Sequence, residues 1–163
     1  MEKMERVNRI LSDEEFRIKC REIAVLEKDR IYCKHQIDHF LSVARIAVLL
    51  CEEKDLTIDR ELIYAAALLH DIGRGVQYQT GERHELASIK IAPDILKRSG
   101  FYEEEIAEII EAIANHRNKE IEQCSDLNGI FYRADKLSRN CFCCEAESLC
   151  DKETAKKTLF LYY

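Results

Sequence analysis

A histidine and an aspartate stand side by side at the end of an apolar run. The stretch AALLHDIGRG, residues 66–75, places His70 and Asp71 directly after alanines and leucines. A buried carboxylate is costly unless it is paired or binds a metal. The pair therefore predicts either an exposed helix end or a bound cation.

The other four histidines and a second aspartate also fall beside apolar positions. His35 and His39 are four residues apart, so on one helix they share a face. His116 and Asp135 follow apolar residues at helical spacing, and His84 opens a helix after a glycine-rich loop. A single histidine of this kind is more often a satisfied core residue. Several such groups without partners would each cost about 1–3 kcal/mol, against a total stability of roughly 5–15 kcal/mol, so together they predict a bound metal.

Three motifs resemble those of the HD-domain metal-dependent phosphohydrolases. HFLSVARIA supplies His39, LLHDIGR supplies His70 and Asp71, and RADKLSR supplies Asp135. The resemblance covers roughly residues 30–140 of the chain. It implies an all-α fold, a single-domain helical bundle of the HD-domain/PDEase-like type.

Two further motifs, HELAS with His84 and IANHR with His116, are similar to those of the six-ligand, dinuclear subset of this family. The resemblance implies two divalent transition-metal ions. Imidazole together with carboxylate suits iron, manganese or zinc better than calcium or magnesium, and the resemblance implies iron first, with manganese or zinc as alternatives. By resemblance, one ion is held by His39, His70, Asp71 and Asp135, and the other by Asp71, His84 and His116, with Asp71 bridging.

The order of the motifs is similar to that of bacterial di-iron hydrolases that cleave diadenosine tetraphosphate. This implies hydrolysis of a phosphate ester or anhydride in a small, nucleotide-type substrate. A metal-bridging hydroxide held at Asp71 would be the nucleophile, and the ions would neutralise charge on the phosphoryl group. Those relatives carry a lysine three residues after the aspartate of the pair, where this chain has Arg74. A guanidinium also binds phosphate, but as a planar fork.

Arg74 stands between two glycines next to the His-Asp pair, so we expect it to bind the substrate. Arg117, Lys136 and Arg139 are further candidates for binding substrate, and the alternative for each is a solvated surface charge. His35 lies one turn before His39. It would orient the substrate, act as a general acid, or be a buried core histidine.

Two other functions are left open by these motifs. A few six-ligand relatives are mixed-valent di-iron oxygenases that act on an organic substrate. A non-catalytic nucleotide-binding or sensory domain is the second alternative. The intact ligand set argues against it, because a binding module does not need two metals.

The elements that must position these residues are predicted to be helices, since the chain has 1 proline and 5 glycines. Ser12 and Glu15 have the spacing of a capping box, which predicts a helix start. Pro93 is expected to kink or break the helix that begins at His84, and Gly100 to end it. The other expected elements are helices over 32–53, 59–71, 101–117 and 125–139, the last capped by Ser125 or Asp126, and a loop over 73–83.

The composition describes a folded chain of 163 residues with a formal net charge of -6. This charge argues against binding a nucleic-acid polymer, which needs a basic surface. The N-terminus has no apolar signal sequence and no stretch reaches membrane-spanning length, so we expect a cytoplasmic protein without a membrane partner. A homo-oligomer is left open. We expect one domain over 1–163, with the motif core at about 30–140 and a Cys-rich segment at 141–163.

The eight cysteines are expected to be reduced in the cytoplasm. Cys141, Cys144 and Cys150 crowd a short stretch, and the first two have the C-x-x-C spacing of metal knuckles. An additional metal at these three residues is one interpretation. The other is a segment that packs reduced thiols as small hydrophobic groups.

Overall fold

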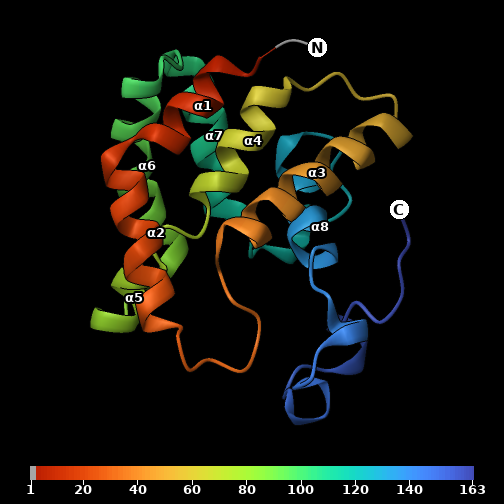
Figure 1. The fold of residues 1–163 in the computed structure, drawn as a ribbon. Helices are drawn as coiled ribbons and strands as arrows, with labels where there is room; N and C mark the ends of the chain where they lie inside the picture. The colour runs from red at the N-terminus through yellow and green to blue at the C-terminus, as the bar shows by residue number, and fades with distance from the viewer. Residues whose placement is uncertain (1–2) are drawn as a thin grey trace.

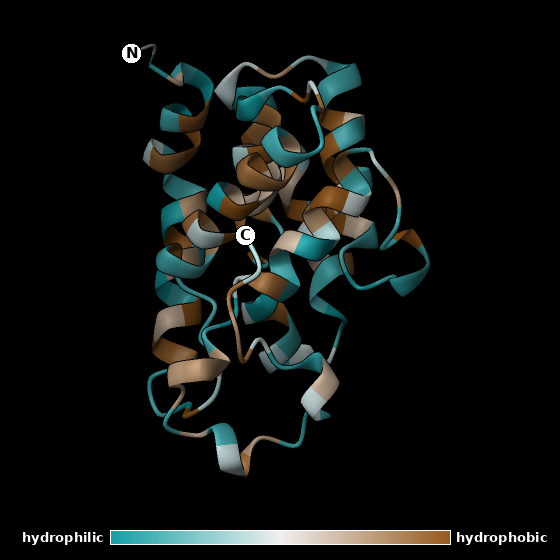
Figure 2. Cartoon of the chain, turned by 90° about the vertical axis from the view of Figure 1, so that its right-hand side faces the viewer, coloured by the Kyte–Doolittle hydropathy of each residue, from teal (hydrophilic) through white to brown (hydrophobic). Residues whose placement is uncertain are grey.

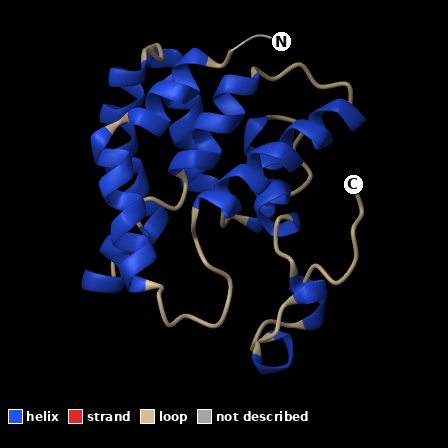
Figure 3. Ribbon diagram, in the orientation of Figure 1, coloured by secondary structure: helices blue, strands red, loops and turns tan. Residues whose placement is uncertain are grey.

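The computed structural model describes residues 3–163 and contains helices but no strands in that range (Figures 1 and 3). The all-α fold expected from the sequence is confirmed. The α-helices are α1 Glu5–Ser12, α2 Glu14–Leu26, α3 Ile37–Glu53, α4 Arg60–Leu69, α5 Arg74–Thr80, α6 His84–Ser99, α7 Glu103–Asn115 and α8 Leu127–Leu137. The described residues also form four single-turn 3-10 helices: η1 Lys119–Ile121 between α7 and α8, and η2 Cys141–Cys143, η3 Glu147–Leu149 and η4 Thr154–Lys156 after α8.

Helix α4 forms the centre of the bundle and packs against α1, α3 and α7. Its residues from Ala65 to Leu69 are all buried, as expected for a helix that is apolar on every side. Helices α3 and α7 also pack against α8, and α6 covers α7. Apolar residues gather between the helices and polar residues on their outer faces (Figure 2). Among the described residues, no helix combines the length and the apolar character that crossing a membrane requires.

The N-terminal part of the chain differs from the sequence prediction. Ser12 does not cap a helix, because it is the last residue of the additional helix α1. Asp13 is the N-cap of α2 instead, and its side chain accepts from the Phe16 backbone N–H at 3.1 Å. At α8, the Asp126 side chain accepts from the Gly129 N–H, so of the two expected caps the structure selects Asp126.

Two other boundaries also differ. Residues 74–80 form α5 inside the expected loop, and Gly81 ends this helix with a φ of 80°. The helix expected over 32–53 begins only at Ile37. Residues 27–36 form a turn and an irregular loop, which we call the His35 loop. His35 therefore precedes the helix and does not share a helical face with His39.

Pro93 lies inside α6 and does not break it. The neighbouring Ala92, Ile95 and Leu96 are buried, and their packing holds the helix across the hydrogen bond that proline cannot donate. Gly100 ends the helix in the left-handed conformation with a φ of 90°, as expected from the sequence.

The last part of the chain, residues 139–163, extends from one end of the bundle (Figure 1). We call it the C-terminal segment. Its regular structure consists of three single-turn 3-10 helices, η2 to η4. The His35 loop extends from the same end of the bundle, and the Tyr32 hydroxyl donates to the Leu149 carbonyl oxygen at 3.2 Å.

Candidate metal centre

The six residues expected to bind metal come from five separate segments of the bundle. His39 is in the first turn of α3, and the His70–Asp71 pair directly follows α4. His84 is the first residue of α6, His116 directly follows α7, and Asp135 lies within α8. All are buried except His39, which is partly exposed. The packing of five segments thus brings residues 96 positions apart in the sequence to one point.

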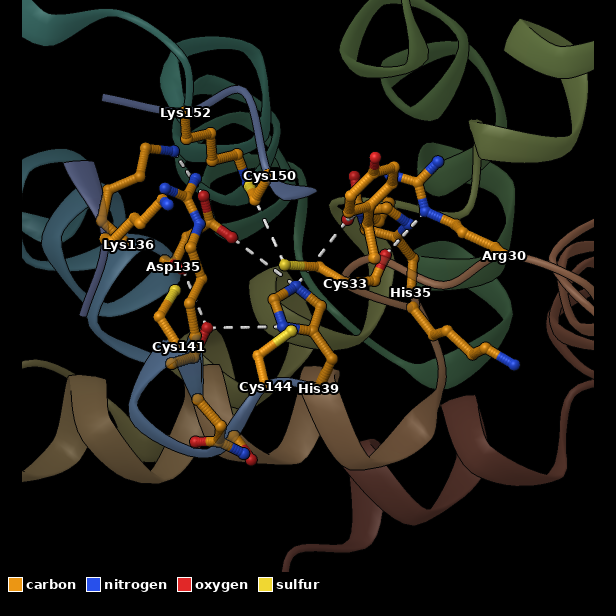
Figure 4. Close-up of a pocket in the computed structure, with 18 of the residues that line it drawn as sticks. Arg30, Cys33, His35, His39, Asp135, Lys136, Cys141, Cys144, Cys150 and Lys152 are labelled. Carbon is orange, nitrogen blue, oxygen red and sulfur yellow. Dashed lines mark hydrogen bonds and ion pairs between the residues drawn. The ribbon is translucent and has the colours of Figure 1, made fainter. Parts of the chain in front are cut away.

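One group of three side chains contains His39, His70 and Asp135. The Nε2 atoms of the two histidines are 3.3 Å apart. Asp135 Oδ1 lies 3.5 Å from His39 Nε2 and 3.8 Å from His70 Nε2. The spacing of these three atoms suits one metal ion between them. Figure 4 shows two of the three residues, His39 and Asp135, with their side chains pointing toward one another.

A second group contains Asp71, His84 and His116. The Nε2 atoms of His84 and His116 are 3.0 Å apart, and Asp71 Oδ1 lies 3.1 Å from His84 Nε2. The other carboxylate oxygen of Asp71, Oδ2, lies 3.3 Å from His70 Nε2. Asp71 therefore points one oxygen toward each group.

Gly73 allows α6 to approach the turn that carries His70 and Asp71. A Cβ atom at Gly73 would lie 2.3 Å from the His84 carbonyl oxygen. The Gly73 N–H donates to Ser88 Oγ at 2.9 Å, and the Ser88 hydroxyl donates to the His70 carbonyl oxygen at 2.7 Å. This contact fixes the position of His84 relative to the His-Asp pair.

Backbone carbonyls orient two of the rings. His70 Nδ1 donates to the Ala67 carbonyl oxygen at 2.8 Å, and His116 Nδ1 donates to the Ile113 carbonyl oxygen at 2.6 Å. Each bond requires the proton on Nδ1 and turns Nε2 toward the site. Partners of this kind fix the tautomer of histidines that bind metals.

Gln77 orients the third ring from α5. Its Oε1 lies 3.0 Å from His84 Nδ1 and accepts from Arg74 Nη1 at 3.2 Å. His84 therefore also carries its proton on Nδ1 and presents a lone pair at Nε2. Two nitrogen lone pairs, those of His84 and His116, then face each other across 3.0 Å beside the Asp71 carboxylate. Such a contact is repulsive unless a cation accepts all three groups, so the donor set fits a metal ion.

The protonation states agree with this fit. Burial lowers the pKa of His39 and His116 to about 4, and the charge of His70 adds to the shift. Burial also lowers the pKa of His84 to about 3. These three rings are therefore neutral near pH 7, which is the form that binds a metal.

The two carboxylates stay ionised although burial opposes this. The charges of His70 and Arg74 hold the pKa of Asp71 well below its ordinary value. The charges of Lys136 and His70 do the same for the pKa of Asp135. Burial alone would lower the pKa of His70, but these two carboxylates raise it.

His35 is held by a buried carboxylate that the sequence analysis missed. Glu27 is 1% exposed and bonds to His35 Nδ1, and its other oxygen accepts from the His35 backbone N–H at 2.7 Å. The Tyr78 hydroxyl also donates to Glu27 at 2.6 Å. Burial would raise the pKa of Glu27, but these bonds lower it to about 2. His35 Nε2 then faces the site, 3.8 Å from Asp71 Oδ2.

The four cations expected to bind substrate all line one cavity of about 650 Å³, together with His35 and five of the six expected ligands. Arg74 donates from Nε to Asp71 Oδ1 at 3.0 Å. Lys136 bonds to Asp135 and donates to the His116 carbonyl oxygen at 2.9 Å. Two cations lie further out: Arg117, 3.6 Å from Glu85 Oε2, and Arg139, which donates to the Lys156 carbonyl oxygen at 3.3 Å.

All eight cysteines are free thiols. Cys141, Cys144 and Cys150 line the cavity (Figure 4). Within residues 3–163, no three sulfur atoms lie within 4.8 Å of one another, as the ligands of a single ion would. A metal at these three residues alone stays a prediction.

The sequence matches the HD domain over residues 37–140, more than half of the chain. The chain belongs to the HD-domain family. This confirms the family expected from the motifs. The matched region begins with α3 and ends after α8, so it contains all six residues described above and leaves out the His35 loop and most of the C-terminal segment.

Several proteins are similar to this HD-domain chain. An uncharacterized protein of Clostridium beijerinckii is 43% identical over 160 residues, which are 98% of this chain and 100% of that protein. Ribonuclease Y of Acetivibrio thermocellus is 34% identical over 107 residues, but these are 66% of this chain and only 18% of that enzyme. The crystal structure of a predicted HD superfamily hydrolase from an uncultured Thermotogales bacterium superposes with a TM-score of 0.64 at 23% identity, covering 90% of this chain and 80% of that one. The match to this crystal structure shows that the two proteins share a fold.

Proposed function

We propose that this protein is a metal-dependent phosphohydrolase that cleaves a phosphate ester or anhydride of a small nucleotide-type substrate at a dinuclear site. The observation that carries the proposal is the contact between His84 and His116. Both rings are neutral, both donate from Nδ1, and their Nε2 lone pairs meet beside Asp71. A divalent ion satisfies this arrangement, and the second group at His39 suits another ion.

The chain's residues have distinct roles in this proposal. His39, His70 and Asp135 would hold one ion, His84 and His116 the other, and Asp71 would contact both. Bound divalent ions lower the pKa of water and neutralise charge that builds on a phosphoryl group. Iron is the metal that we favour for this ligand set, with manganese and zinc as alternatives.

His35 is placed to handle a proton at the rim of the site. Its Nδ1 is engaged by Glu27, so Nε2 is the atom that faces the cavity. A ring fixed in this way can hold a proton at Nε2 for the leaving group, as a general acid. Tyr78 and Glu27 act as positioning residues for this ring.

The charge of the cavity favours a phosphate substrate. Eight lysine and arginine side chains and five acidic side chains line the cavity, whereas the whole chain has a net charge of -6. Arg74 and Lys136 contact Asp71 and Asp135, two of the candidate metal ligands. A cavity of about 650 Å³ is within the range that binds small ligands. An excess of cations is less suited to an oxygenase acting on a neutral organic substrate.

The test is a hydrolysis screen on protein purified without oxygen and loaded with Fe²⁺ or Mn²⁺. The panel contains nucleoside mono-, di- and triphosphates, diadenosine tetraphosphate and a short RNA. The RNA is included because a matched relative is named ribonuclease Y. We expect product from at least one small nucleotide and little from the RNA. Turnover of the RNA alone, or oxygen uptake without phosphate chemistry, would reject the proposal.

A matched pair of variants separates catalysis from folding. His116→Ala removes a proposed ligand, whereas Asn115→Ala changes its neighbour, whose side chain donates to the Glu111 carbonyl oxygen of its own helix at 3.1 Å. We expect His116→Ala to lose most activity and Asn115→Ala to keep it. Equal activity in both variants would contradict the ligand role.

A further inference from the structure

Five of the eight cysteines line the same cavity as the candidate metal centre. Cys33 comes from the His35 loop, and the other four come from the C-terminal segment more than a hundred residues later. Figure 4 shows Cys33 together with Cys141, Cys144 and Cys150 on the cavity wall. The sequence spacing of the C-terminal cysteines gives no indication that Cys33 would join them.

The His35 loop and the C-terminal segment are in direct contact at this point. The Tyr32 hydroxyl donates to the Leu149 carbonyl oxygen at 3.2 Å. Lys152 Nζ lies 4.0 Å from Cys33 Sγ. Lys157, which also lines the cavity, donates to the Glu147 carbonyl oxygen at 2.9 Å within the C-terminal segment. These contacts hold the two segments side by side along the cavity wall.

The C-terminal segment lacks a core that would hold it in place. Across residues 139–163, all of which the structure describes, only Ala146 and Thr158 are buried. Apolar side chains such as Phe142 and Leu149 are exposed instead. Chain segments without a hydrophobic core usually depend on a disulfide or a metal for a fixed structure.

We propose that Cys33, Cys141, Cys144 and Cys150 bind an iron–sulfur cluster that joins the C-terminal segment to the His35 loop. Cys143 is left out because it is exposed and its thiol donates to the Asn140 carbonyl oxygen at 3.6 Å. The remaining cysteines of the chain, Cys20, Cys51 and Cys124, do not line the cavity.

The spacing of the thiols favours a cluster over a single ion. A tetrahedral zinc with Zn–S bonds of ~2.3 Å would bring its sulfur atoms to about 4 Å from one another. Within the described residues no three sulfur atoms come within 4.8 Å of one another. In a cluster each thiolate binds a different iron, so the sulfur atoms stand further apart. The four proposed ligands are all thiols and include no imidazole, whereas the candidate metal centre beside them contains four histidines.

The cluster is tested through acid-labile sulfide, because metal bound at the candidate metal centre would bring no inorganic sulfide with it. Full-length protein is expressed with added iron, purified without oxygen and reconstituted with Fe²⁺ and sulfide. We expect about four sulfides per chain and a broad visible absorption, as for a [4Fe–4S] cluster with four thiolate ligands. This measurement does not depend on phosphohydrolase activity, so the two proposals can fail separately.

Matched cysteine variants then locate the cluster. Cys33→Ser and Cys144→Ser should lose at least nine-tenths of the sulfide, whereas Cys143→Ser and Cys124→Ser should retain it. Far-ultraviolet circular dichroism checks that the helices persist in each variant. Wild-type protein without sulfide, one zinc at the same thiols, a disulfide from Cys33 found by mass spectrometry, or equal loss in Cys143→Ser would each overturn the proposal.

Discussion

The helical body and the C-terminal segment line one cavity, but they are held in place by different interactions. In the body, Phe40 and Phe131 are fully buried. The centroids of their rings lie 5.5 Å and 5.4 Å from the centroid of the His70 ring. In the C-terminal segment, Phe142 is 48% exposed. The ligand positions of the body therefore follow from close packing of apolar side chains. The segment has no such packing, so its position has to come from polar contacts and cross-links.

Truncating one phenylalanine in the helical body and one in the C-terminal segment should give the largest difference in the free energy of unfolding. Phe131→Ala leaves a cavity beside His70 and should lower the free energy of unfolding by about 3–5 kcal/mol. Phe142→Ala removes an exposed side chain and should change it by no more than about 0.5 kcal/mol. Urea denaturation of metal-free protein measures both. Similar losses in the two variants would show that the C-terminal segment is packed as tightly as the body.

Glu27→Gln should have the next largest effect, because Glu27 connects the body to the His35 loop. Its folded pKa of about 2 lies below the ordinary 4.5, so ionised Glu27 stabilises the folded chain above pH 4.5. This contribution is lost as the pH falls from 4.5 toward 2. Near neutral pH we expect Glu27→Gln to cost about 1.5–3 kcal/mol in unfolding free energy. The difference in unfolding free energy between Glu27→Gln and wild type should become smaller near pH 3.

Glu22→Gln is the matched control, on helix α2, which directly precedes Glu27. Glu22 is a partly exposed partner of Lys19 at 3.1 Å, so we expect a change of at most about 0.5 kcal/mol. Denaturation curves of metal-free protein at both pH values provide the comparison. A Glu27→Gln difference that stayed constant with pH would mean that Glu27 is not ionised in the folded chain.

Arg74→Ala should have a smaller effect that is confined to catalysis. We expect kcat/KM to fall roughly ten- to a hundredfold with metal content unchanged, because a charge-assisted hydrogen bond to phosphate is lost. Arg74→Lys should recover part of the loss. Arg117→Ala, at the more exposed rim, should lose less. Loss of metal in Arg74→Ala would mean that its bond to Asp71 serves the metal site instead of the substrate.

The residues that meet at the site could be predicted from sequence, whereas the groups that orient them could not. The spacing of His39, His70 and Asp135 relative to apolar residues indicates that they face inward. Glu27 reaches His35 across an irregular loop, and no periodic pattern marks such a contact. Gln77 lies on α5, where three glycines in the sequence favoured a loop.

Helix α1 was missed because its stability comes from distant residues. Arg6 on this short helix bonds to Glu61 at the start of α4 and donates to Glu105 of α7 at 2.7 Å. Helices this short are marginal without tertiary contacts. Cys33 was missed as a neighbour of the other cysteines for the same reason, since only the folded chain brings the His35 loop to the C-terminal segment.

The dinuclear site is tested most directly by counting metal ions in three proteins loaded with Fe²⁺ without oxygen. We predict close to two ions per chain in wild type and about one in His84→Ala, because His84 belongs to only one of the two groups. Asp71→Ala should lose most of both ions, since Asp71 directs one oxygen to each group. Circular dichroism confirms that each variant is folded. Full metal content in Asp71→Ala, or equal loss of both ions in folded His84→Ala, would contradict the shared site.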